Sequence, residues 1–105
     1  MRGRWKRGRG LFRRRMEELP PRSVIREHAF EDELRALIRD ALAADEFVEA
    51  AEFLLARDPR TGSQWSPGSA VWVMPMAPLE GKSVALFYTF DDAAVCFFSI
   101  RAFAY

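Results

Sequence analysis

The stretch LLARDPRTG, residues 54–62, divides the chain into a helical part and a β-rich part. Pro59 has no amide donor and disfavours a helical conformation at Asp58, and Gly62 tolerates the positive φ that a tight reversal requires. The segment before this junction is rich in Ala, Glu and Leu, whereas the segment after it is β-branched and aromatic and carries few charges. This order predicts a small α+β domain whose helices precede most of its strands.

One strand and two helices are predicted upstream of the junction. Residues 23–28 have the composition of a short strand, and the apolar positions of residues 30–42 follow the three-four spacing of a helix. The apolar positions then change phase, so we place a helix break near residues 43–44, with Asp45 capping a second helix that runs to the junction. The two helices are expected to form an antiparallel hairpin. A single bent helix is the alternative.

Three strands are predicted downstream, separated by short turns. The expected elements are a loop over 63–69, a strand over 70–74 ended by Pro75 and Pro78, a turn over 80–82, a strand over 83–90, a turn over 91–93 and a strand over 94–103. Strands this close in sequence form an antiparallel meander. The predicted fold is therefore an N-terminal strand, an αα-hairpin and a three-stranded meander packed on the hairpin as a two-layer sandwich.

Composition excludes several classes of protein. The chain has 105 residues, of which half are hydrophobic, and this suits a single soluble domain, placed here at residues 22–105. Cysteine and histidine each occur once, as Cys96 and His28, so neither a disulfide framework nor a zinc site is expected, and no cofactor is predicted. The lone cysteine makes a reducing, cytoplasmic setting the default. No apolar run is long enough to span a bilayer, so no membrane partner is expected.

Charge is distributed very unevenly along the chain. The first fifteen residues contain eight bases and no acid, whereas the remaining ninety contain eight bases and fifteen acids, a balance of −7. Residues 1–21 are therefore expected to form a disordered basic tail that contacts nucleic-acid phosphates. Its basic residues are Arg2, Arg4, Lys6, Arg7, Arg9, Arg13, Arg14 and Arg15. The alternative is that translation starts at Met16, where the composition changes.

Three short motifs occur in a characteristic order. A Leu-x-x-Asp-Pro-x-x-Gly segment ends the helices (residues 55–62), a Leu-Phe-Tyr segment lies in the predicted central strand (86–88), and Val-x-Phe-x-x-Ile lies in the last strand (95–100). In this order the motifs resemble the RelE/ParE superfamily of bacterial toxins. The resemblance implies a toxin of a toxin–antitoxin module, which either cleaves messenger RNA on the ribosome or inhibits DNA gyrase. It also implies a cognate antitoxin as partner.

The resemblance directs attention to the central and last strands. RelE-like nucleases usually carry an arginine shortly before the tyrosine of the central strand, where this chain has Val84 and Ala85. The candidate catalytic residues are Arg101 as a phosphate ligand, Tyr105 as a stacking group or acid, and Tyr88. Arg60 and Lys82 join the basic tail as candidate nucleic-acid contacts.

Alternation along the last strand assigns its side chains to two faces. Phe97, Ser99, Arg101, Phe103 and Tyr105 are predicted on the exposed face, and Cys96, Phe98, Ile100, Ala102 and Ala104 against the helices. A metal-independent endoribonuclease is thus one hypothesis, and an attenuated toxin is a variant of it. The other hypotheses are a protein-interaction module that uses Trp65, Trp72 and Phe103, and a nucleic-acid adaptor that uses the basic tail.

Overall fold

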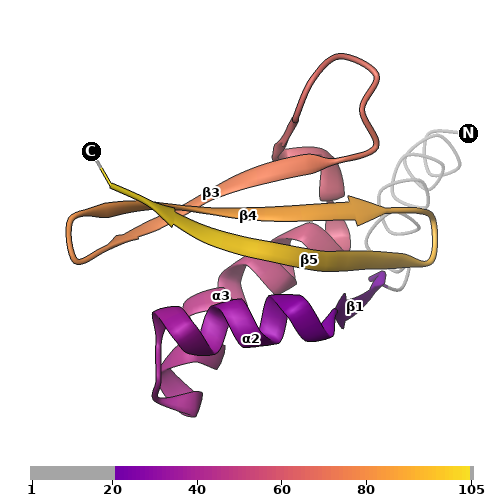
Figure 1. Ribbon diagram of the computed structural model, residues 1–105. Coiled ribbons are helices and arrows are strands. Elements are labelled where there is room, and N and C mark those ends of the chain that lie inside the picture. The colour runs from indigo at the N-terminus through magenta and orange to yellow at the C-terminus, as the bar shows by residue number, and fades with distance from the viewer. Residues whose placement is uncertain (1–20, 105) are drawn as a thin grey trace, which may run out of the picture.

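The computed structural model describes residues 21–104, in which two helices pack on a five-stranded mixed sheet (Figure 1). The elements are β1 (Ser23–Arg26), α2 (His28–Leu37), α3 (Ala41–Arg57), a 3-10 turn η1 (Pro59–Thr61), β2 (Ser63–Gln64), β3 (Trp72–Leu79), β4 (Lys82–Phe90) and β5 (Ala94–Phe103). The sheet order is β1-β5-β4-β3-β2. The predicted α+β fold, with its leading strand, helical pair and meander, is confirmed.

The sheet contains two pairings beyond the meander. Strand β1 lies parallel to the first half of β5, with Ser23 opposite Ala94 and Arg26 opposite Phe97. The two-residue β2, within a segment predicted as a loop, pairs antiparallel with the start of β3. Because β1 is short, the chain leaves the sheet after Arg26, and α2 then runs beside the rest of β5 (Figure 1). This placement brings one flank of α2 to the edge of the sheet.

The helix break lies earlier than predicted. Helix α2 ends at Leu37, Ile38 is extended (φ −134°, ψ 106°), and α3 begins at Ala41. The Asp40 carboxylate caps α3 by accepting a hydrogen bond from the Ala43 amide at 2.9 Å, so the break near residues 43–44 and the cap at Asp45 were wrong. Asp45 instead lies inside α3, where it pairs with Arg26. Two separate helices are present rather than one bent helix.

Strand β3 is longer than its prolines suggested. It runs through both Pro75 and Pro78, which were predicted to end it. Beyond Val73 this strand pairs only with β4, so its other edge is unpaired within the described residues. A proline that lacks an amide donor is tolerated on such an edge. The following turn forms as predicted, with positive φ at Glu80 (50°) and Gly81 (78°).

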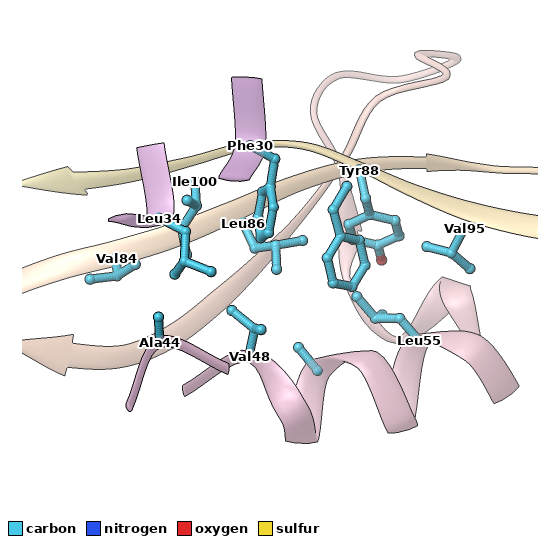
Figure 2. Close-up of a cluster of buried hydrophobic side chains, with 12 residues drawn as sticks. Phe30, Leu34, Ala44, Val48, Leu55, Val84, Leu86, Tyr88, Val95 and Ile100 are labelled. Carbon is cyan, nitrogen blue, oxygen red and sulfur yellow. The ribbon is translucent and has the colours of Figure 1, made fainter. Parts of the chain in front are cut away.

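The hydrophobic core fills the space between α3, α2 and one face of the sheet (Figure 2). Its fully buried side chains include Phe30, Leu34, Val48, Leu55, Leu86, Tyr88, Val95, Phe97 and Ile100. The rings of Phe30 and Phe97 meet edge to face, with centroids 5.4 Å apart, and tie α2 to β5. The core therefore fixes the position of α2 relative to β5.

Tyr88 of β4 holds the junction at residues 54–62 in place through two hydrogen bonds. The buried Tyr88 hydroxyl donates a hydrogen bond to the Pro59 carbonyl (2.5 Å) and accepts one from the Gly62 amide (3.2 Å). Gly62 has φ −74°, not the positive φ that was expected. Glycine is needed there for space, because a Cβ atom would lie 2.6 Å from the Val73 carbonyl oxygen and closer still to the Tyr88 hydroxyl.

Arg26 joins β1 to both helices. Its guanidinium donates two hydrogen bonds to Glu52 of α3 (2.9 and 3.1 Å), one to Asp45 of α3 (2.9 Å) and one to Glu31 of α2 (3.2 Å). Burial alone would lower the pKa of Arg26, but its hydrogen bonds to these carboxylates outweigh that effect and raise it. The guanidinium therefore stays charged and holds three carboxylates together.

Candidate functional site

A bulge in β5 decides which side chains reach the sheet face turned away from α3, here called the open face. The register between β4 and β5 shifts so that Phe87 opposes Ser99 while Tyr88 opposes Phe97, which leaves Phe98 as the extra residue. Phe97 is therefore buried in the core, and Phe98 lies beside Ser99 on the open face, so strict alternation gave the wrong face for Cys96 and for both phenylalanines. After the bulge, Ser99 and Arg101 point outward and Ile100 packs inward, as predicted.

A cavity of about 460 Å³ opens on this face. We call it the aromatic slot; its lining residues are Ala29 and Glu33 of α2, Trp65 of the loop after β2, Phe87 of β4, and Phe98, Ser99, Arg101 and Phe103 of β5. It thus lies where the flank of α2 meets the bulged strand. Segments distant in sequence build it, because α2 lies beside β5 and Trp65, which follows β2, packs on Phe87 of β4.

Aromatic rings form the wall of the slot. Trp65 packs edge to face on Phe87, with ring centroids 5.4 Å apart. The ring of Phe87 also lies next to that of Phe98, with centroids 6.5 Å apart. Trp65 and Phe103 remain about half exposed or more, at 63% and 49%. Exposed rings of this kind offer flat surfaces for a base or for an apolar side chain.

The polar end of the slot is formed by Glu33, Ser99 and Arg101. The Ser99 hydroxyl donates to Glu33 Oε1 at 2.9 Å and accepts from Arg101 Nε at 3.2 Å. Arg101 Nε also lies 3.6 Å from Glu33 Oε2. Ser99 is buried, whereas the side chain of Arg101 is 65% exposed. The guanidinium is thus oriented through Nε, and its two terminal nitrogens make no hydrogen bond within residues 21–104.

The structure separates the predicted site residues. Arg101 lies in the slot, but Tyr88 is fully buried on the opposite side of the sheet and its hydroxyl is engaged at the junction. Burial also raises the pKa of the Tyr88 phenol, and the catalytic role predicted for this residue stays a prediction. Arg60 is exposed in η1, and Lys82 is exposed at the start of β4, next to the β3–β4 turn. Neither residue lines the slot. Tyr105 and the eight basic residues of positions 2–15 lie outside the described residues.

The residue that sequence reasoning missed is Glu33. Glu31, Asp32 and Glu33 are consecutive acids near the start of α2, a position that the helix dipole favours for any acid. In the structure these three carboxylates separate: Glu31 pairs with Arg26, Asp32 faces His28, and only Glu33 enters the slot. The flank of α2 that meets β5 depends on the helix position, which local sequence does not specify.

Cys96 is an unreactive thiol at the edge of the open face. Its Sγ lies 3.1 Å from Glu27 Oε1, to which the S–H donates. Partial burial and the neighbouring carboxylate raise the pKa of Cys96 to about 11, so the thiol stays protonated at neutral pH. Across residues 21–104, no group of three or more His, Cys, Asp or Glu side chains is arranged to hold a metal ion.

The fold resembles that of a chain in a solved toxin–antitoxin complex. The chain is similar to a chain in the crystal structure of the toxin–antitoxin complex RelBE2 from Mycobacterium tuberculosis, with a TM-score of 0.60 and 21% sequence identity, covering 84% of this chain and 98% of that one. No family model matches the sequence, and no curated protein matches it. The fold is thus RelE-like, in agreement with the predicted resemblance. Neither of the two helices that the structure describes is long and apolar enough to cross a membrane.

Proposed function

We propose that this protein is the toxin of a toxin–antitoxin module and that it binds and cleaves RNA in the aromatic slot. The observation that carries this proposal is the position of Arg101, which is oriented by Ser99 at the edge of a cavity walled by exposed aromatic rings. Stacking surfaces beside a cation are the combination that binds single-stranded nucleic acid. The sequence motifs and the RelE-like fold support the same function class.

Arg101 suits a phosphate ligand because its anchoring contacts use only one of its nitrogens. The Nε atom is held at 3.2 Å from Ser99, while both terminal nitrogens stay available for a bidentate contact with two phosphate oxygens. A base next to that phosphate would stack on Trp65 or Phe103, which are the most exposed rings of the slot. Phosphate and base are thus bound by different parts of one cavity.

The proposal includes an antitoxin and an RNA-attracting segment outside the slot. The similar solved chain comes from a toxin–antitoxin complex, which supports an antitoxin as partner here. Residues 21–104 contain thirteen acids and eight bases, a balance of −5 that repels RNA. The eight bases of residues 1–15 would offset that charge, and we propose that they contact RNA phosphates together with Arg60 and Lys82.

A second candidate function, inhibition of a protein target such as gyrase, is favoured by one feature of the slot. The four aromatic side chains and a balanced Glu33–Arg101 pair also suit an apolar surface of another protein. In that case Arg101 would act as an ion-pair partner rather than as a phosphate ligand. The two functions differ in whether RNA is cut.

Induced expression of the full chain in bacteria, without an antitoxin, tests the proposal. We expect growth arrest with messenger RNA cut at mapped sites, and we expect Arg101→Ala to relieve both effects. Arg35→Ala, an exposed arginine on α2 away from the slot, is the matched control and should stay toxic. Growth arrest with intact messenger RNA and blocked gyrase supercoiling would favour the protein target, and unhindered growth would contradict both functions.

A further inference from the structure

We propose that Glu33 is the general base of RNA cleavage in the aromatic slot, an inference that rests on the proposed function. Among residues 21–104, Glu33 is the only carboxylate that lines the slot, and it lies beside the arginine proposed to bind phosphate. Its position on the flank of α2 is fixed by the neighbouring Phe30 and Leu34, which are both fully buried in the core. The carboxylate is therefore presented by a rigid element rather than by a loop.

The two oxygens of Glu33 have different surroundings. Oε1 accepts a hydrogen bond from Ser99 at 2.9 Å, which sets the orientation of the carboxylate. Oε2 lies 3.6 Å from Arg101 Nε, too far for a hydrogen bond, and accepts none from the described residues. The Glu33 side chain lines the slot and is 34% exposed. One oxygen is thus anchored, and the other is available to accept a proton.

Arg101 and Glu33 line the same cavity and lie close enough together to act on one nucleotide. A phosphate held by the terminal nitrogens of Arg101 places its own nucleotide next to the guanidinium whose Nε is 3.6 Å from Glu33 Oε2. The 2′-hydroxyl adjoins that phosphate, and a general base acts from about 3 Å, so the proposed role requires the bound nucleotide to bring this hydroxyl to Oε2. No other carboxylate competes there, because Glu31 is bound by Arg26 and Asp32 faces His28.

The reaction balances without a metal ion. Glu33 Oε2 takes the proton of the 2′-hydroxyl, and the 2′-oxygen attacks phosphorus. The bond from phosphorus to the 5′-oxygen then breaks, and that oxygen takes a proton from solvent water. The products are a 2′,3′-cyclic phosphate and a free 5′-hydroxyl, and the Glu33 proton returns to solvent. Arg101 stabilises the charge that develops on the phosphate oxygens.

Cleavage by purified full-length variants tests this role in a bacterial translation extract with a reporter messenger RNA. We expect Glu33→Gln to cut on the order of 10²-fold more slowly, or worse, while it binds a single-stranded RNA oligonucleotide at least as tightly as the wild type. Asp32→Asn, which removes the adjacent carboxylate outside the slot, is the matched control and should cut at the wild-type rate. Glu33→Asp keeps a carboxylate and should retain more activity than Glu33→Gln.

The outcomes separate this inference from the proposed function. If the wild type cuts RNA and Glu33→Gln cuts equally fast, Glu33 is not the base, although the toxin function stands. If the wild type cuts nothing in the extract, both the function and the role of Glu33 are overturned. Retained RNA binding and an unchanged thermal unfolding curve show that Glu33→Gln is folded. Should that variant unfold, the rate of Glu33→Asp decides, because a wild-type rate for the shortened carboxylate contradicts its use as a positioned base.

Discussion

At the scale of single residues, the contact between Tyr88 and the helix-to-sheet junction connects the two halves of the chain. The Tyr88 hydroxyl satisfies the Pro59 carbonyl and the Gly62 amide at once, and the absence of a side chain at Gly62 leaves room for the ring. The sequence placed a tyrosine in the central strand and a glycine in the junction. It did not show that they meet, because β4 follows the junction by two further strands.

Replacing Tyr88 by phenylalanine tests this contact. We expect the free energy of unfolding to fall by about 1–3 kcal/mol, because a buried carbonyl and an amide each lose a hydrogen-bond partner. Chemical denaturation measures this loss. RNA cleavage per folded molecule should stay at the wild-type level, since Tyr88 does not line the slot. A loss of cleavage with unchanged stability would support the catalytic role that the motif suggested.

At the scale of secondary-structure elements, Arg26 is the main polar link between the sheet and both helices. It lies at the end of β1, its side chain is only 18% exposed, and its carboxylate partners come from α2 and α3. Removing the guanidinium leaves Glu31, Asp45 and Glu52 close together without a counter-charge. Such a loss costs more than the loss of an isolated surface ion pair.

We expect Arg26→Ala to destabilise the domain by about 2–4 kcal/mol, with a smaller loss in Arg26→Lys, which keeps the charge but not the bidentate contact with Glu52. Urea unfolding followed by circular dichroism measures both values. The control is Arg35→Ala, an exposed arginine on α2, which should change stability by less than about 0.5 kcal/mol. Equal free energies of unfolding for Arg26→Ala and the control would show that the ion pairs of Arg26 with Glu31, Asp45 and Glu52 contribute no net stability.

Local sequence predicted those elements whose boundaries are set by local chemistry. The bounds of β5 and the 80–82 turn agree with the structure because strand composition and turn residues are read directly from the chain. The helix break was placed too late, since the Asp40 cap competes with Asp45 and packing decides between them. The length of β3 and the bulge at Phe98 depend on which neighbour each strand meets, and this is tertiary information.

The candidate site was only partly predictable, because most of its residues are brought together by tertiary contacts. Arg101 followed from alternation, because the predicted phase matches the part of β5 that follows the bulge. Glu33 and Trp65 reach the slot from a helix and from a loop, so no spacing in the sequence connects them with Arg101. Tyr88 was chosen from a strand motif, but its face of the sheet is the one that α3 covers.

At the scale of the whole molecule, charge is divided between two parts of the chain. Residues 1–15 carry eight bases, while residues 21–104 have a balance of −5. If RNA is the ligand, the basic residues supply most of the long-range attraction, and the slot supplies orientation.

A variant that lacks residues 1–15, and so starts at Met16, tests this division. We expect its affinity for single-stranded RNA to fall at least tenfold at about 0.1 M salt, because phosphate contacts are lost. The slope of log affinity against log salt concentration should flatten by about 0.7 for each contact removed. Filter binding over a range of salt concentrations measures both quantities. An unchanged affinity and slope would exclude these residues from RNA binding.

The two prolines of β3 have a consequence for how the protein behaves in concentrated solution. Pro75 and Pro78 interrupt the row of amide donors on an edge that β2 leaves uncovered beyond Val73. An edge with missing donors is a poor template for a strand of another molecule, so sheets of neighbouring molecules do not readily join there. The prolines therefore protect this edge against pairing with the sheet of another molecule. This protection matters in a domain whose open face also exposes the aromatic rings of Trp65 and Phe103.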